Sequence, residues 1–311
     1  MEYRIFGRTG LRVSAIGLGT GGASMLGQAY GHSIEDATRH VRRALDLGIN
    51  YIDTAAGYKD SEAMLGQALA GVARDSYILS TKFWPERNGV YASAEDVAAS
   101  IDRSLQKLQT DFVDIFYLHG VSPAAYPRSV ELYSATLEKA RADGKVKFLG
   151  MSEQYGSDYH HEMVQLMAQN PLFDAAMIGY NVVGPAAAIK ALPAMKEQNV
   201  GVAIMCAIRK VIARPEELTT LIDSWKAEGI LAADAVPSDA PLDWLLGNGC
   251  DAVADAAYKF AAAHPAVSTV LTGTANTHHL EQNVAAVLGP GLRPELVKRA
   301  MDVFAPIARN I

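Results

Sequence analysis

Eight short apolar segments alternate with eight longer amphipathic segments along almost the whole chain. We predict strands at residues 15–19, 49–53, 77–82, 112–118, 146–151, 174–180, 200–206 and 268–272. The predicted helices cover residues 35–47, 61–71, 94–107, 129–143, 159–169, 186–198, 251–263 and 277–287. Apolar strands separated by helices are typical of a parallel sheet that helices cover. Eight such units favour an α/β fold closed into a (β/α)8 TIM barrel over an open doubly wound sheet.

Two segments fall outside this repeat. Residues 1–14 hold two short strand-like runs around a turn at Arg8-Thr9-Gly10, which predicts a β-hairpin that caps one end of the barrel. Residues 209–248 form a long excursion between the seventh strand and its helix, which predicts a functional lid or a small subdomain. Because no linker rich in Pro, Gly or Ser divides the chain, we expect residues 1–311 to form a single domain.

Composition excludes several classes of function. Half of the 311 residues are hydrophobic, and the net charge of −6 comes without a cluster of Lys or Arg, so we expect no nucleic-acid partner. No apolar run approaches the ~18 residues of a membrane span, and the N-terminus lacks a signal peptide. Two cysteines, Cys206 and Cys250, are too few for a disulfide framework. We therefore predict a cytoplasmic protein with no membrane partner, whose oligomeric state the sequence leaves open.

Polar side chains stand at the ends of successive predicted strands. Asp53, Lys82 and His119 end the second, third and fourth strands, and Tyr58 follows Asp53 across a turn of small residues. The carboxyl ends of barrel strands face one side, so we expect these four side chains to lie together. An unpaired buried ammonium is costly, and Asp53 is the natural partner of Lys82. The four groups together predict proton-transfer chemistry.

Two other motifs do not predict a site. Residues 17–22 match the dinucleotide fingerprint G-x-G-x-x-G, but glycines at 27 and 31 interrupt the helix that a Rossmann fold requires there. His160-His161-Glu162 resembles part of a zinc motif, but Gln165 occupies the position of the second histidine. We therefore interpret residues 160–162 as a solvated helix start and predict no metal site.

Several segments of the chain resemble the aldo-keto reductases. The matching segments are residues 3–20, 48–58, 80–83, 114–119, 144–152 and 280–283. The resemblance implies a barrel that binds a nicotinamide cofactor without a Rossmann domain. It also implies an NAD(P)(H)-dependent oxidoreductase, of the carbonyl reductase or alcohol dehydrogenase type, acting on a small carbonyl or alcohol substrate.

The same resemblance implies catalytic roles for the four strand-end residues. Tyr58 would be the general acid or base, and the Lys82 ammonium would lower its pKa. Asp53 would hold Lys82 charged and oriented, while His119 would hydrogen-bond the substrate oxygen. Two alternatives stay open: a nicotinamide-binding regulatory or sensor subunit with little turnover, and cofactor-assisted isomerisation or elimination on a sugar.

The cofactor contacts implied by the resemblance come mostly from the second half of the chain. They are Gly19, Thr20, Asp53, Ser152, Met177, Met205, Cys206, Arg209, Gly273, Thr274, His279, Gln282 and Asn283. Several departures from the usual pattern occur. Glu153 replaces the Asn that usually follows Ser152, Met177 replaces a Gln, and Met205 replaces an aromatic residue that commonly stacks under nicotinamide.

Further departures concern the 2′-phosphate that distinguishes NADP(H) from NAD(H). The positions that commonly carry Lys or Arg hold Gly273, Ala275 and His279. Because a phosphate dianion normally recruits a guanidinium or an ammonium, we predict that NAD(H) serves as readily as NADP(H), or better. If NADP(H) is preferred instead, the candidate cations are Arg209, Lys210 and Arg214.

The predicted substrate pocket consists of residues near the barrel mouth. They are Met25, Tyr30, Phe83 and Trp84, together with part of the excursion 209–248. Phe83 and Trp84 directly follow Lys82, which predicts a flat aromatic wall suited to an aryl, terpenoid or sugar-ring face.

Overall fold

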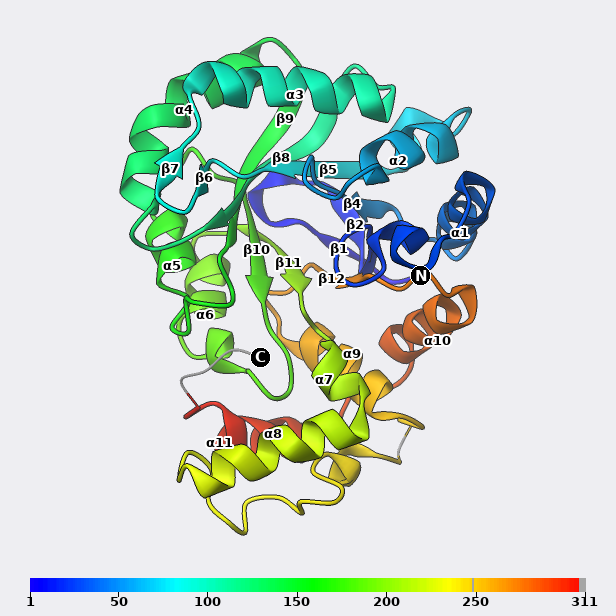
Figure 1. Ribbon diagram of the computed structural model, residues 1–311, viewed down its shortest axis with the longest axis vertical. Coiled ribbons are helices and arrows are strands. Elements are labelled where there is room, and N and C mark those ends of the chain that lie inside the picture. The colour runs from blue at the N-terminus through cyan, green and yellow to red at the C-terminus, as the bar shows by residue number, and fades with distance from the viewer. Residues whose placement is uncertain (248, 308–311) are drawn as a thin grey trace.

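Eight parallel strands form a closed barrel in the computed structural model, which describes residues 1–247 and 249–307 (Figure 1). Neighbours around the barrel are hydrogen-bonded in the order β10-β11-β12-β3-β4-β5-β8-β9. The strands are β3 (Ile16–Gly19), β4 (Tyr51–Asp53), β5 (Ile78–Phe83), β8 (Val113–Val121), β9 (Val146–Glu153), β10 (Ala175–Gly179), β11 (Gly201–Met205) and β12 (Thr269–Thr272). The predicted (β/α)8 barrel is confirmed. Residue 248 of the predicted excursion and residues 308–311 of the predicted domain lie outside the described residues.

Helices surround this barrel, as Figure 1 shows. They are α1 (Ile34–Asp46), α2 (Ser61–Leu69), α3 (Ala94–Leu108), α4 (Tyr126–Ala142), α5 (Glu162–Ala168), α6 (Ala191–Glu197), α9 (Val253–Ala263) and α10 (Thr277–Leu288). The starts of α1 and α3 are fixed by capping boxes, in which Ser33 pairs with Asp36 and Ser93 with Asp96. Helix α5 begins three residues later than predicted because the Asp158 carboxylate accepts the first free amides, those of residues 162 and 163.

The predicted N-terminal hairpin is confirmed. Strands β1 (Tyr3–Ile5) and β2 (Arg12–Ser14) pair antiparallel, and the 3-10 turn between them packs on the start of β11. Phe6 and Val13 are fully buried in the barrel interior, together with Tyr51 and Tyr117 from the strands. The hairpin therefore closes one end of the barrel with apolar side chains, and the site must lie at the other end.

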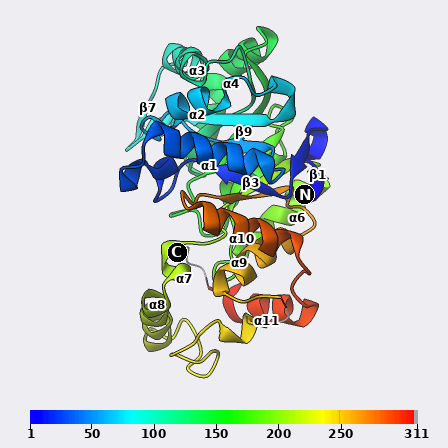
Figure 2. The same cartoon turned by 90° about the vertical axis from the view of Figure 1, so that its right-hand side faces the viewer.

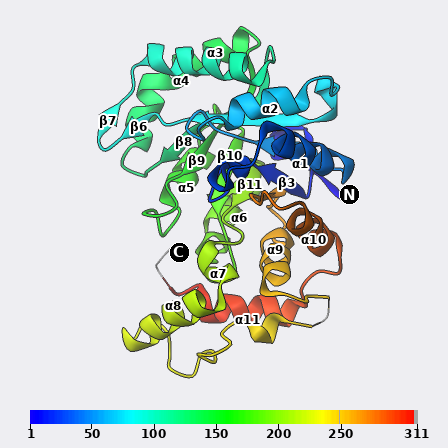
Figure 3. The same ribbon diagram turned by 45° about the vertical axis from the view of Figure 1, so that its right-hand side comes forward.

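The excursion after β11 holds two helices, α7 (Lys210–Ala213) and α8 (Pro215–Ala227), followed by irregular chain that leads to α9. A further helix, α11 (Pro294–Phe304), was not predicted. Helices α8 and α11 lie in a lobe on one side of the barrel (Figure 2), and α7 and α9 stand between that lobe and the barrel (Figure 3). The excursion predicted after the seventh strand is therefore present, and its role as a functional lid or a small subdomain stays a prediction. Within the described residues, no helix is long and apolar enough to cross a membrane.

A second, unpredicted hairpin follows β5. Its strands β6 (Glu86–Arg87) and β7 (Val90–Tyr91) pair antiparallel around Asn88 and Gly89, which both have positive φ. An Asn-Gly pair in this conformation is the preferred two-residue hairpin turn. The Tyr133 hydroxyl lies 2.9 Å from the carbonyl oxygens of both Pro85 and Ala92, which flank the hairpin. It donates its proton to one of them and so holds the base of the hairpin.

Two glycines of the N-terminal turn test how tightly the hairpin fits the barrel. Both have positive φ, +52° at Gly7 and +70° at Gly10, so alanine is strained at either position. A Cβ at Gly7 would lie 2.2 Å from the Gly201 nitrogen, whereas a Cβ at Gly10 would meet nothing within 4 Å. We expect Gly10→Ala to lower the free energy of unfolding by about 1 kcal/mol. We expect Gly7→Ala to lower it by about 3 kcal/mol, since the clash is with backbone.

Urea denaturation of the two variants beside the wild type measures both changes. Equal losses at Gly7 and Gly10 would contradict close packing of the hairpin against β11.

Candidate active site

The four strand-end residues lie together at the open end of the barrel. Asp53 ends β4 and Lys82 lies near the end of β5, so the two neighbouring strands present their side chains to each other. The Lys82 ammonium lies 2.5 and 2.6 Å from the two carboxylate oxygens of Asp53. It also lies 5.1 Å from the ring centroid of Tyr58, and the Tyr58 and His119 rings meet edge to face with centroids 5.7 Å apart. The expected cluster therefore exists as a geometric arrangement.

Lys82 and Asp53 form an almost fully buried ion pair. Their side chains are 1% and 3% exposed, and two further hydrogen bonds complete the pair: Lys82 donates to the Thr54 carbonyl and the Ser80 hydroxyl donates to Asp53, both at 2.7 Å. Burial raises the pKa of Asp53 and lowers that of Lys82, while the opposite charge of each partner acts against the shift. The close, fully hydrogen-bonded geometry keeps two charges tolerable in the barrel.

The pKa of Tyr58 is raised above its ordinary value, first by burial and then by the Asp53 carboxylate and Cys206. The net direction is therefore the opposite of the one predicted from Lys82, because burial dominates. The Lys82 ammonium does not offset this effect of burial, since its hydrogen bonds go to Asp53 and to the Thr54 carbonyl. At neutral pH Tyr58 is therefore a protonated phenol.

His119 is also neutral. Burial lowers its pKa well below the ordinary value, and the positive charges of Lys82 and Arg87 lower it further. Its ring stacks on Trp84 with centroids 4.2 Å apart and planes 9° apart. Its buried Nδ1 has no hydrogen-bond partner among the described residues. The imidazole is thus held by stacking on Trp84 and by the edge-to-face contact with Tyr58.

The predicted aromatic wall needs correction. One face of Trp84 is covered by His119, and the Arg87 guanidinium lies 4.2 Å from the same ring centroid, which places it on the other face. Gly57 permits this packing, since a Cβ there would lie 1.7 Å from the indole. Neither face of Trp84 is free to receive a flat substrate, and Phe83 beside it is half-buried.

The other two predicted substrate residues lie in a six-residue 3-10 segment, Met25–Tyr30. Tyr30 is 65% exposed and, with His32 and Asn276, lines a cavity of about 500 Å³ that adjoins the larger one at Gly273, Thr274 and His279. Met25 lines neither this cavity nor the larger one described next. The structure therefore does not bring Tyr30 to the four strand-end residues.

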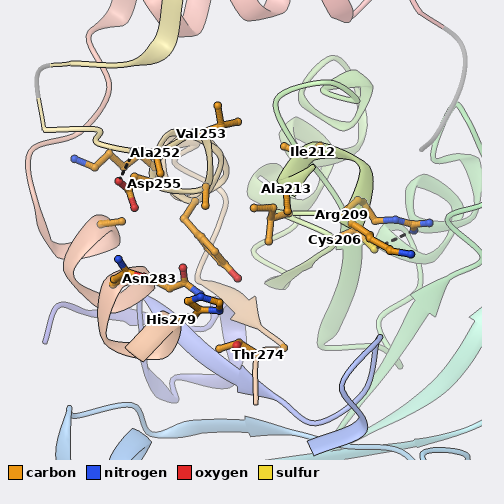
Figure 4. Close-up of a pocket in the computed structure, with 18 of the residues that line it drawn as sticks. Cys206, Arg209, Ile212, Ala213, Ala252, Val253, Asp255, Thr274, His279 and Asn283 are labelled. Atoms are coloured by element: carbon orange, nitrogen blue, oxygen red, sulfur yellow. Dashed lines mark hydrogen bonds between the residues drawn. The ribbon is translucent and has the colours of Figure 1, made fainter. Parts of the chain in front are cut away.

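A cavity of about 1640 Å³ begins at Asp53 and Tyr58 and extends to α10. Figure 4 shows its two walls: Cys206, Arg209, Ile212 and Ala213 on one side, and residues of α9 and α10 on the other. The predicted cofactor residues that line it are Gly19, Asp53, Met177, Met205, Cys206, Arg209, Gly273, Thr274, His279, Gln282 and Asn283. Thr20 and Ser152 do not line it; both are buried, and Ser152 accepts a hydrogen bond from the Gly120 amide at 2.8 Å.

The donor set of this cavity fits a dinucleotide. Met177 and Met205 offer apolar surface at the Tyr58 end, Arg209 and Lys210 offer two cations along one wall, and amide side chains follow on α10. Of those amides, Asn283 already donates to the Thr272 hydroxyl at 2.9 Å, which fixes its orientation. The volume exceeds the ~300–1,000 Å³ of drug-sized ligand sites.

Sequence reasoning missed the wall that α9 provides. Tyr258, Asp255 and Lys259 line the cavity from this helix. Burial raises the pKa of Tyr258 to about 12, and the Lys259 ammonium donates to two backbone carbonyls, those of Gly249 and Pro290, both at 2.7 Å. The sequence of α9 is largely apolar and small, so nothing in it distinguished a cavity-facing side.

Glu153 and His161 form an unexpected buried pair. His161 is fully buried, so the interpretation of residues 160–162 as a solvated helix start is wrong for it. Glu153 accepts from His161 Nδ1 at 2.8 Å and from the Gly179 amide at 2.7 Å. Its carboxylate therefore links β9 to β10 and does not line the cavity. Among the described residues, no group of three or more His, Cys, Asp or Glu could hold a metal ion.

Comparison with known proteins agrees with this geometry. The model of the Aldo/keto reductase family matches residues 15–299. The chain is 32% identical to L-galactose dehydrogenase of Arabidopsis thaliana over 317 residues, 99% of this chain and 95% of that protein. An aldo-keto reductase from Bacillus halodurans, in its holo form, superimposes with a TM-score of 0.75 at 24% identity, covering 98% and 97% of the two chains.

A second solved structure has the same fold. It is an aldo-keto reductase from Klebsiella pneumoniae in complex with NADPH, with a TM-score of 0.69 at 23% identity and coverage of 98% and 96%. The family match and the full-length relative confirm the resemblance to the aldo-keto reductases that the sequence segments indicated. The chain belongs to the aldo/keto reductase family of oxidoreductases.

Proposed function

We propose that this protein transfers a hydride between a nicotinamide cofactor and a carbonyl or alcohol carbon, with Tyr58 giving or taking the proton. The observation that carries the proposal is the position of Tyr58. It lies at the end of the large cavity and adjoins both the Lys82–Asp53 ion pair and His119. A bound nicotinamide would supply or accept the hydride at that end of the cavity.

The four side chains have different roles in the proposed reaction. His119, as a neutral imidazole, donates a hydrogen bond to the substrate oxygen and orients the carbonyl. Tyr58 donates its proton to the same oxygen as negative charge develops there. The Lys82 ammonium, 5.1 Å from the ring centroid, stabilises the phenolate that this transfer leaves. Asp53 keeps Lys82 in place throughout.

The full-length relative named L-galactose dehydrogenase supports aldoses as one class of substrate to test. We propose assays of NAD(P)+ reduction with aldoses and of NAD(P)H oxidation with aldehydes and ketones. The intact ion pair beside Tyr58 favours turnover over a sensor role. Cofactor binding without hydride transfer to any of these compounds would favour the sensor instead, and sugar isomerisation without net cofactor consumption would favour the isomerase.

Replacement of the phenol tests the role of Tyr58. We expect Tyr58→Phe to reduce kcat by about 10²-fold or more, because the proton donor is lost while the ring remains. Cofactor affinity, measured by fluorescence titration, should stay within about twofold of wild type, because the cavity keeps its shape. Turnover close to wild type in this variant would refute the role.

The raised pKa of Tyr58 and the lowered pKa of His119 predict the pH dependence of both directions. Carbonyl reduction needs the protonated phenol, so kcat/KM should stay flat from about pH 6.5 to about pH 9, below the ordinary tyrosine pKa. Alcohol oxidation needs the phenolate, so its rate should rise with pH across that window. A limb near the ordinary histidine pKa in carbonyl reduction would contradict a neutral His119.

Cofactor choice follows from the cavity wall at α10. We infer that NAD(H) binds at least as well as NADP(H), because Gly273, Thr274 and His279 present no permanent cation there. Lys259 does not substitute for one, since its ammonium is bound to two carbonyls. Arg214, another candidate, pairs with Glu217 at 2.5 Å and does not line the cavity.

Adjacent histidines provide a matched test of this inference. Only His279 lines the large cavity, whereas its neighbour His278 does not. We expect His279→Arg to tighten NADPH binding about tenfold with little change for NADH, because a guanidinium then meets the 2′-phosphate. His278→Arg adds the same charge and should change neither dissociation constant. NADPH binding a hundredfold tighter than NADH in the wild type would overturn the inference.

A further inference from the structure

The hairpin after β5 presents an arginine beside the predicted substrate mouth. Arg87 lies on β6, and its guanidinium stacks on Trp84, which in turn stacks on His119. Two successive stacking contacts of 4.2 Å thus connect the guanidinium to the imidazole that we propose as the hydrogen-bond donor to the substrate oxygen. No role for this side chain follows from hydride or proton transfer.

The platform that holds Arg87 is rigid. Trp84 fits against Gly57, where a Cβ would clash at 1.7 Å, and its indole nitrogen would lie 3.3 Å from a Cβ at Gly120. The hairpin itself is closed by the tight Asn-Gly turn and fastened to the Tyr133 hydroxyl. A guanidinium stacked on an aromatic face keeps its N–H groups directed outward in the plane of the stack. Those donors are therefore preorganised.

Within the described residues, the structure gives Arg87 no carboxylate partner. Glu86 is adjacent in sequence, but successive strand residues point to opposite faces, and the Glu86 carboxylate accepts from the Gly89 amide within the turn. Arg87 is exposed, so its donors are open to a ligand. The charge nevertheless reaches the site, because it is one of the groups that lower the pKa of His119.

The ligand of Arg87 is not a phosphate of the cofactor. The cavity that fits a dinucleotide begins at Asp53 and Tyr58 and extends past the ends of β10, β11 and β12 to α9 and α10, and Arg87 does not line it. Around the barrel, β3 and β4 separate β5 from β12, and β8 and β9 separate it from β10. Figures 1 and 3 show the hairpin β6–β7 well away from α9 and α10. An oxyanion at Arg87 must belong to the other reactant.

The geometry points to a substrate that carries a carboxylate or a phosphate at some distance from the carbonyl or alcohol carbon, bound by the Arg87 guanidinium. Both anions share the oxygen pair that a guanidinium binds with two parallel hydrogen bonds. This inference rests on the proposed function, which defines the substrate as a carbonyl or alcohol compound. It adds that the substrate carries an anionic group.

Matched pairs of aldehydes test this selectivity by binding alone. The first pair is 4-carboxybenzaldehyde and 4-nitrobenzaldehyde, in which the nitro group has the shape of the carboxylate without its net charge. The second is glyceraldehyde 3-phosphate and glyceraldehyde, which separates a phosphate source from a carboxylate source. Dissociation constants are measured calorimetrically, with and without saturating NAD+, at low and at physiological ionic strength.

Three variants accompany the wild type. Arg87→Met keeps an unbranched stem over the indole and removes the charge, and Arg87→Lys keeps the charge without the planar fork. Arg103→Ala is the control, since Arg103 is exposed on α3 and its loss changes the net charge equally. We expect the wild type and Arg103→Ala to bind the anionic member of one pair about tenfold more tightly, Arg87→Met to bind both members equally, and Arg87→Lys to lie between.

The preference should weaken as salt is added, because Arg87 is exposed. An anion preference that survives in Arg87→Met, or a wild type that binds neither anion more tightly than its neutral partner, overturns the inference. Failure of the proposed function has a different signature. In that case the binding preference follows Arg87 as described, while the wild type transfers no hydride to or from any compound tested.

Discussion

The buried ion pair between Lys82 and Asp53 is the interaction on which the rest of the site depends. Two charges removed from water are tolerated only in close, fully hydrogen-bonded geometry. Parallel pairing of β4 with β5 provides it by placing Asp53 opposite Ser80, whose hydroxyl supports the carboxylate, and within reach of Lys82. Packing at the end of the barrel leaves these two side chains 1% and 3% exposed. Fold and site are thus linked by one constraint: any shift of register between these strands would leave two buried charges without partners.

The same ion pair contributes to the pKa of Tyr58. Burial raises the pKa of the phenol, and the Asp53 carboxylate raises it further. A strong acid is not required for a group that gives up its proton only as the substrate oxygen becomes basic. The compensated ammonium still lies 5.1 Å from the ring centroid, where it can stabilise the charge that the transfer creates.

The sequence predicted the strands and the residues at their ends, because both depend on short local patterns of apolar and polar residues. The strands could be predicted because they are buried on both sides and thus apolar along their length. Asp53, Lys82 and His119 could be assigned to one site because the strand ends share one face of a barrel. The direction of the Tyr58 pKa, the two occupied faces of Trp84 and the burial of His161 against Glu153 depend on contacts between distant segments, which no spacing encodes. Helix α11 has a local signal, a proline at its start and apolar residues at helical spacing, but it lies outside the eightfold repeat of strands and helices.

Two insertions on opposite sides of the barrel carry the residues to which we assign selectivity. The strand ends are fixed by the ion pair, whereas loops can change with little cost to the core. The excursion after β11 supplies one wall of the large cavity, including residues of α7. The hairpin after β5 supplies Arg87, which stacks on Trp84. Because different loops carry these two features, the choice of cofactor and the choice of substrate can vary independently while the proton-transfer group between them stays the same.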